Sequence, residues 1–80
     1  MKCTFKVSII GVGKVGATAA YALCLSGPLT ELVLIAHHQE TADAEKLDLE
    51  HALPFLHNIN IVASDTYEAV AGSDVIVITA

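Results

Sequence analysis

Short apolar runs alternate along the chain with longer segments in which apolar and polar positions mix. The apolar runs are rich in β-branched residues and stop at glycine or polar residues, a pattern that predicts β-strands. These strands are expected at residues 5–10, 31–36, 60–63 and 74–79. The segments between them predict helices at residues 14–25, 41–53 and 66–71. The first is followed by a Ser-Gly-Pro stop, and the second is amphipathic and closed by Pro54.

The order βαβαβαβ predicts one fold class. Strands separated by helices form a parallel sheet through right-handed crossovers, with helices on its faces. We therefore expect an α/β, Rossmann-type segment with strand order 3-2-1-4. In that order the apolar run 75–78 lies at the sheet edge, where an exposed strand invites association. The expectation is that the chain is the first part of a longer one, or that another chain covers this edge.

Composition narrows the class of protein. The chain has 80 residues, of which 54% are hydrophobic and only 16% charged, and its mean hydropathy is +0.60. Such a chain folds around a core and is not disordered. It is about the size of one small domain, so it has no room for both a cofactor domain and a separate substrate domain.

Charge and cysteine content exclude further classes. A net charge of −5 and a pI near 5.0 disfavour a nucleic-acid partner. No apolar stretch approaches the roughly 18 residues of a membrane helix, so no membrane or targeting segment is expected. Two cysteines make no disulfide framework, which favours a reducing, cytoplasmic location.

A glycine-rich turn carries the main candidate chemistry. Gly11, Gly13 and Gly16 form GxGxxG between a predicted strand and a predicted helix. The first glycine makes the tight turn, the second lets a pyrophosphate approach the backbone, and the third allows close helix–strand packing. The helix N-terminus then receives the phosphates. A P-loop is excluded, because Val15 follows Lys14 where Ser or Thr would bind Mg²⁺.

The cofactor preference depends on one position at the end of the second strand. Enzymes that use NAD place an acidic residue there, about 20 positions on, to bind the ribose hydroxyls. Ala36 occupies this position, so about 1.5 to 3 kcal/mol of hydrogen bonding to a charged acceptor is missing. The charge that would repel a 2′-phosphate is missing too, and His37 and His38 could assist that phosphate when protonated. The cofactor is therefore NAD or NADP, and an Ala36→Asp variant should bind NAD more tightly.

The remaining polar residues allow simpler interpretations. The four histidines lack metal-site spacing, so no metal is expected. Glu45, Asp48 and His51 share one side of the second predicted helix, either as a solvated face or as an intersubunit patch. No nucleophile–base arrangement or carboxylate pair stands out. No catalytic residue is therefore assigned.

Three segments together resemble one family, the L-lactate and malate dehydrogenases. They are residues 7–16, 45–52 and 73–80, and the similarity spans residues 6–80. The stretch DLEHALPF at residues 48–55 resembles bacterial lactate dehydrogenases more than malate dehydrogenases.

The resemblance implies a role for each matching position. Gly11, Val12, Gly13, Lys14, Val15 and Gly16 would hold the pyrophosphate, with Val15 touching the dinucleotide. Ala36 would occupy the ribose position and Tyr67 the adenine loop, and Thr79 and Ala80 would lie beneath the nicotinamide ribose. The second helix would form a subunit interface, which implies a homo-oligomer.

These expectations combine into one function. Residues 1–80 are expected to form the cofactor-binding segment of an NAD(P)-dependent L-2-hydroxy-acid dehydrogenase, with lactate favoured over malate as substrate. In the resembling family the catalytic histidine, its aspartate partner and the substrate-binding arginines come after residue 80, so the segment alone should be inactive. A Rossmann binding module without catalysis and a nucleotide-sensing regulatory domain remain alternatives.

Overall fold

A computed structural model describes residues 4–11, 13–27, 29–54 and 58–79. The described elements are β1 (Lys6–Ile10), α1 (Lys14–Ser26), β2 (Glu31–Ile35), α2 (Gln39–Ala52), β3 (Asn60–Ser64), the 3₁₀ turn η1 (Tyr67–Val70) and β4 (Val75–Ile78). The strands are parallel and lie in the order β3-β2-β1-β4. The α/β fold, the element order and the 3-2-1-4 topology are thus confirmed.

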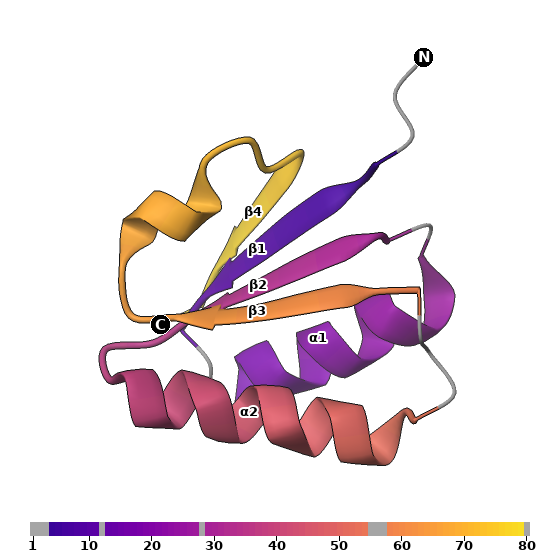
Figure 1. The fold of residues 1–80 in the computed structure, drawn as a ribbon, viewed down its shortest axis with the longest axis horizontal. Coiled ribbons are helices and arrows are strands. Elements are labelled where there is room, and N and C mark those ends of the chain that lie inside the picture. Colours follow the sequence, from indigo (N-terminus) through magenta and orange to yellow (C-terminus); the bar gives the residue numbers. More distant parts are fainter. Residues whose placement is uncertain (1–3, 12, 28, 55–57, 80) are drawn as a thin grey trace.

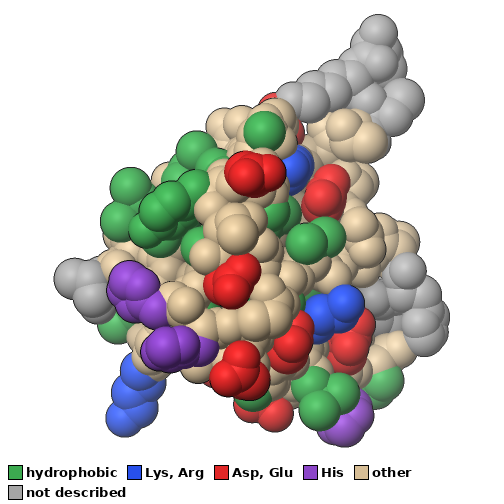
Figure 2. Space-filling model, turned by 60° about the vertical axis from the view of Figure 1, so that its left-hand side comes forward, with side chains coloured by type: hydrophobic (Ala, Val, Ile, Leu, Met, Phe, Trp, Pro, Cys, Tyr) green, Lys and Arg blue, Asp and Glu red, His purple; other side chains and the backbone are tan. Residues whose placement is uncertain are grey.

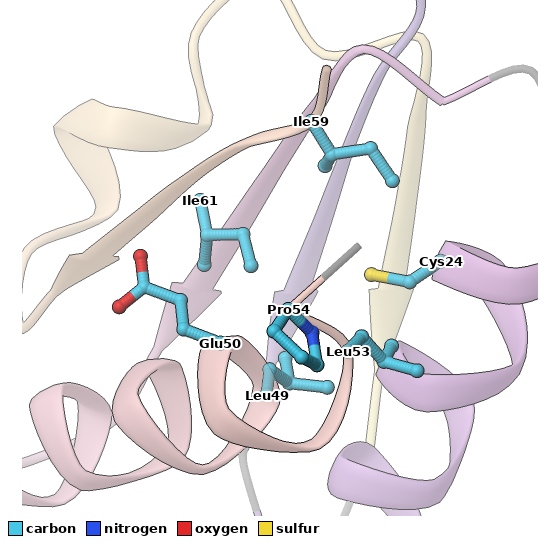
Figure 3. Close-up of a pocket in the computed structure, with 7 residues that line it drawn as sticks. All are labelled: Cys24, Leu49, Glu50, Leu53, Pro54, Ile59 and Ile61. Carbon is cyan, nitrogen blue, oxygen red and sulfur yellow. The ribbon is translucent and has the colours of Figure 1, made fainter. Parts of the chain in front are cut away.

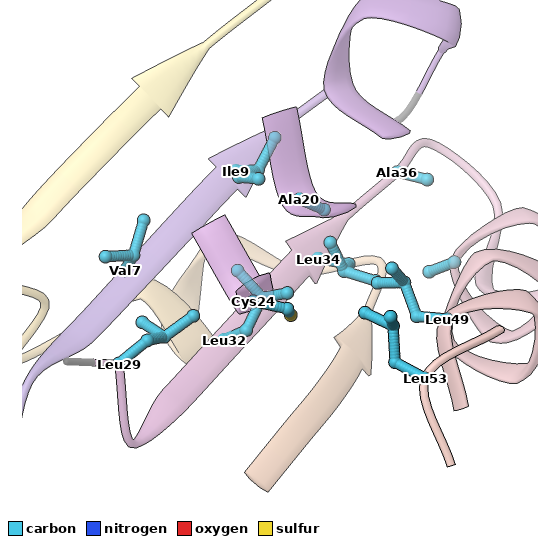
Figure 4. Packing of buried hydrophobic residues seen from close by; sticks show 11 residues of the cluster. Val7, Ile9, Ala20, Cys24, Leu29, Leu32, Leu34, Ala36, Leu49 and Leu53 are labelled. Atoms are coloured by element: carbon cyan, nitrogen blue, oxygen red, sulfur yellow. The ribbon is translucent and has the colours of Figure 1, made fainter. Parts of the chain in front are cut away.

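The layers follow from the alternation of side chains along each strand. Figure 1 shows α1 and α2 on one side of the sheet and η1 on the other. On the helical side, alternate residues of β1 and β2 meet α1 and α2 in a single core (Figure 4). The strand residues of this core are Val7, Ile9, Leu32 and Leu34, and the helix residues are Ala20, Cys24, Ala42 and Leu49.

The first helix ends one residue later than expected, at Ser26, and the other two helical elements differ more. The α2 helix begins at Gln39, two residues early, because the amides of Thr41 and Ala42 donate to the His38 carbonyl. The amide side chain of Gln39 also donates to the Ala63 carbonyl, which ties the helix start to β3. The expected third helix is only a four-residue 3₁₀ turn, too short to bury a face of its own.

The strand β4 lies at the sheet edge, as expected. Its side chains at Ile76 and Ile78 are 48% and 76% exposed. Hydrogen bonds at its start fasten it to β1: the Asp74 amide donates to the Lys6 carbonyl at 2.7 Å, and the hydroxyls of Ser8 and Ser73 lie 2.6 Å apart. An apolar strand is therefore anchored on one side and open on the other.

Candidate functional site

Two adjoining cavities lie where the carboxyl ends of β1, β2 and β4 meet. Both are lined by Gly11, Ala36, His37 and Thr79. The first, here called the Tyr67 cavity, measures about 360 Å³ and also includes Tyr67 and Asp65. The second, here called the Gly13 cavity, measures about 370 Å³ and also includes Gly13, His38 and Thr41. Figure 2 turns the carboxyl ends of the strands toward the reader and shows hydrophobic and histidine side chains next to each other. Ligands of α/β sheets bind in this kind of crevice.

Gly11 turns the chain sharply out of β1. Its φ of +93° lies in the left-handed region, where only glycine is unstrained. A Cβ atom here would lie 2.6 Å from Oγ1 and 2.7 Å from the carbonyl oxygen of Thr79. Thr79 also holds the turn, because its amide donates to the Ile10 carbonyl at 2.9 Å and its hydroxyl donates to the Gly11 carbonyl. The end of β4 thus fixes the glycine turn.

The other two glycines serve different purposes. Gly16 is buried, and a Cβ atom there would overlap the Gly11 carbonyl oxygen, so glycine is what lets α1 approach β1 closely. At Gly13, a Cβ atom would have no neighbour within 4 Å, which leaves the backbone open to a ligand. Gly13 caps α1, and no side chain of the described residues bonds to this helix start. The first-turn amides can therefore donate to an anion.

Position 36, where the sequence predicts the ribose contact, lies at the end of β2 and carries no charge. Ala36 is 9% exposed and its amide donates to the Ser64 carbonyl at 3.1 Å, so it continues the pairing of β2 with β3. The side chains of His37 and His38, which follow, are exposed.

Asp65 was not singled out from the sequence, yet it lies in the same cavity as Ala36. It follows β3 directly. The parallel pairing of β2 and β3 could have indicated it, because the carboxyl ends of neighbouring strands meet.

The expected site residues do not all come together. Gly11, Gly13, Ala36, Tyr67 and Thr79 line the two cavities. Lys14 and Val15 instead line a shallow depression on the outside of α1. Val12 and Ala80 lie outside the described residues.

A separate cavity of about 340 Å³ lies between the end of α2 and the start of β3 (Figure 3). It is lined mainly by apolar side chains, among them Cys24, Leu53 and Ile61, with Glu50 at its border. Burial raises the pKa of the Cys24 thiol, which keeps the sulfur in its protonated, unreactive form.

The groove between α1 and α2 has an acidic side. It is lined by Tyr21, Glu45 and Asp48 among others. Burial raises the pKa of Glu45, and the nearby Asp48 carboxylate raises it further. His51 does not line this groove. In the described part of the chain no three His, Cys, Asp or Glu side chains gather as metal ligands. None of the described helices has the length and apolar character needed to cross a membrane.

The βα glycine turn, the start of α1, to which its N-cap Gly13 offers no side chain, and the crevice above the strand ends define a Rossmann-type dinucleotide-binding domain. The family described as "lactate/malate dehydrogenase, NAD binding domain" matches residues 5–80. The chain belongs to the lactate/malate dehydrogenase family and is an NAD-binding domain of it.

Individual relatives agree with this assignment. An L-lactate dehydrogenase of Clostridium botulinum (strain Hall) is 48% identical over 77 residues, which are 96% of this chain and 24% of that protein. The minor L-lactate dehydrogenase of Enterococcus mundtii, in a ligand-bound form, has a TM-score of 0.84 and 39% identity over 99% of this chain and 25% of that one.

The malate dehydrogenase of Plasmodium falciparum, in complex with NADH, has a TM-score of 0.83 and 33% identity over 94% of this chain and 25% of that one. The chain thus spans about a quarter of the length of the relatives it matches.

Proposed function

We propose that this chain is the cofactor-binding part of an NAD(P)-dependent L-2-hydroxy-acid dehydrogenase that interconverts a 2-hydroxy and a 2-oxo acid. The observation that carries the proposal is the glycine turn, in which Gly16 packs against Gly11 while Gly13 stays open. Lactate is favoured over malate, because similar proteins at 47–48% identity are named L-lactate dehydrogenases.

The residues present fit a dinucleotide. The open backbone of Gly13, the amides of Lys14 and Val15 at the start of α1, and Val12 would hold the pyrophosphate, while the side chains of Lys14 and Val15 lie outside the two cavities. Ala36 would lie beside the adenosine ribose and Tyr67 beside the adenine. Thr79 and Ala80 would lie beneath the nicotinamide ribose. When bound, the nicotinamide supplies hydride chemistry.

This chain's own residues bind and orient the cofactor. Thr79 sets the position of the Gly11 carbonyl, and Gly16 sets the distance between α1 and β1. The groups that take the hydroxyl proton and hold the substrate carboxylate are assigned to a part of the protein beyond residues 1–80. The acidic side of the α1–α2 groove, with Glu45 and Asp48, is assigned to contact between subunits.

Cofactor binding and catalysis are tested separately. NADH fluorescence is titrated with the purified 80-residue chain, after circular dichroism has established that it is folded, and pyruvate-dependent NADH oxidation is followed at 340 nm. We expect binding without turnover from this chain. A folded chain that leaves NADH fluorescence unchanged would overturn the dinucleotide assignment. Turnover of pyruvate by these residues alone would overturn the assignment of the catalytic groups to another part of the protein.

A further inference from the structure

Asp65 lies beside the position from which the ribose carboxylate is missing. The strands β2 and β3 are paired in register, with Ile35 opposite Ser64. The Ala36 amide continues this pairing by donating to the Ser64 carbonyl. Extended one residue beyond the ends of both strands, this register sets Ala36 opposite Asp65, and neighbouring strands lie about 4.8 Å apart. The carboxylate of Asp65 therefore lies one strand away from position 36, where enzymes that use NAD carry their ribose-binding carboxylate.

The backbone around Asp65 is held in place by its neighbours. The Thr66 amide donates to the Ser64 hydroxyl at 3.1 Å, and the hydroxyls of Ser64 and Thr66 lie 3.2 Å apart. This short turn spans Asp65 and fixes where its side chain leaves the chain. The side chain is exposed and lines the Tyr67 cavity. Among the described residues no hydrogen bond or ion pair engages its carboxylate, so its oxygens are available to a ligand.

Because the side chain at position 36 is small, the carboxylate of Asp65 can reach a ligand in the Tyr67 cavity. The methyl group of Ala36 fills little of the cavity that both residues line. A carboxylate at position 36 would fill that space and would also repel Asp65. With alanine at position 36, the carboxylate that lines this cavity is the one that Asp65 carries after β3.

We propose that Asp65 accepts the hydrogen bonds from the adenosine ribose hydroxyls that residue 36 does not make, and that its charge disfavours a phosphate on the 2′ oxygen. This inference rests on the proposed function, because it assigns a residue to the same cofactor site. In this assignment Asp65 makes the site prefer NAD over NADP, whereas Ala36 alone would allow either cofactor to bind. The competing assignment is a 2′-phosphate held in the Gly13 cavity by His37 and His38.

The test compares NADH and NADPH affinities, by fluorescence titration of the protein that contains this chain, in the wild type and three variants. Asp65→Asn removes the charge and keeps the shape. Glu68→Gln, on exposed η1 and outside both cavities, removes one nearby negative charge as a matched control. Asp65→Asn combined with Ala36→Asp returns a carboxylate to the usual position. Thermal unfolding shows that each variant is folded.

We expect the wild type to prefer NADH. Asp65→Asn should weaken NADH binding about ten- to a hundredfold, the range for losing a charged hydrogen-bond acceptor, and should narrow the preference over NADPH. Glu68→Gln should keep the wild-type preference, and the double variant should regain NADH affinity. If Asp65→Asn behaves like Glu68→Gln, or if the wild type prefers NADPH, the role of Asp65 is overturned while the proposed function stands. If the wild type binds neither cofactor, the proposed function itself fails.

Discussion

Substituting the third glycine tests how closely α1 must approach β1. Gly16→Ala adds one methyl group to the first turn of α1. Built on the observed backbone, its carbon overlaps the Gly11 carbonyl oxygen and lies 3.5 Å from Cγ2 of Ile9. Because the overlapped atom is part of the backbone, no rotamer change relieves the contact. The helix must move away from the strand.

Two opposing effects set the change in the free energy of unfolding of Gly16→Ala. Overpacking a buried site costs about 1–3 kcal/mol, and contact with unyielding backbone puts Gly16→Ala at the upper end. Alanine returns about 0.5–1 kcal/mol because it is a better helix former than glycine. The net loss in free energy of unfolding is about 2 kcal/mol, which lowers the Tm of a domain of this size by about 8–16 °C.

Gly13→Ala is the matched control, since it adds the same methyl group three residues earlier. That carbon meets nothing within 4 Å, and the φ of −79° suits any residue. Its free energy of unfolding should stay within about 1 kcal/mol of the wild type, the usual effect at a helix cap. Its NADH affinity should fall, because the methyl group would stand where we propose that the pyrophosphate approaches the backbone. Urea denaturation and NADH titration measure the two effects. A Gly16→Ala protein as stable as the wild type, or a Gly13→Ala protein that unfolds, would refute this reasoning.

Three further predictions concern groups outside the glycine turn. In a Cys3→Ser background, Cys24 should react slowly with Ellman's reagent at pH 8 and rapidly in urea, because burial raises its pKa; fast reaction in the folded protein would contradict this. The raised pKa of Glu45 means that ionisation of this side chain opposes folding. The stability that protonated Glu45 contributes is fully present below the ordinary pKa of about 4.3 and is lost as pH rises through the pKa of the folded protein. Glu45→Gln should therefore have a higher Tm than the wild type at pH 7, and the difference should vanish near pH 3; a constant difference would point to another cause. Ile76→Lys should reduce concentration-dependent association in sedimentation experiments and cost about 1 kcal/mol of stability, since the side chain, on the outermost strand, is 48% exposed.

The fold was predictable because local patterns and topology agree. The run that forms β2 is apolar on both faces, and Val33 and Leu34 are both buried, as expected of a central strand in a parallel sheet. The exposure of Ile78 was also predictable, because strand order 3-2-1-4 leaves β4 outermost. The start of α2 was less predictable from the sequence. It involves a hydrogen bond from the Gln39 side chain to the Ala63 carbonyl, which joins residues 24 apart.

The candidate site was predictable only where one local motif contains it. The GxGxxG spacing indicated the turn at Gly11 and the close approach at Gly16, both of which the backbone geometry shows. It did not indicate that Thr79, 68 residues away, holds the Gly11 carbonyl. No local motif indicates Asp65, because the sequence places position 36 at the end of the second strand, whereas the cavity beside it is also lined by a residue that follows β3.

The hydrogen bonds of Thr79 connect the glycine turn to β4, the strand at the open edge of the sheet. The bonds from Thr79 to Ile10 and Gly11 exist only while the end of β4 is paired with β1. Edge strands with few buried contacts open more readily than central ones, and Ile78, the residue before Thr79, is mostly exposed. Each opening frees the glycine turn, and apparent affinity falls in proportion to the fraction of molecules that hold the competent conformation. Under the proposed function, a neighbour that pairs with β4 would therefore tighten dinucleotide binding without touching the dinucleotide.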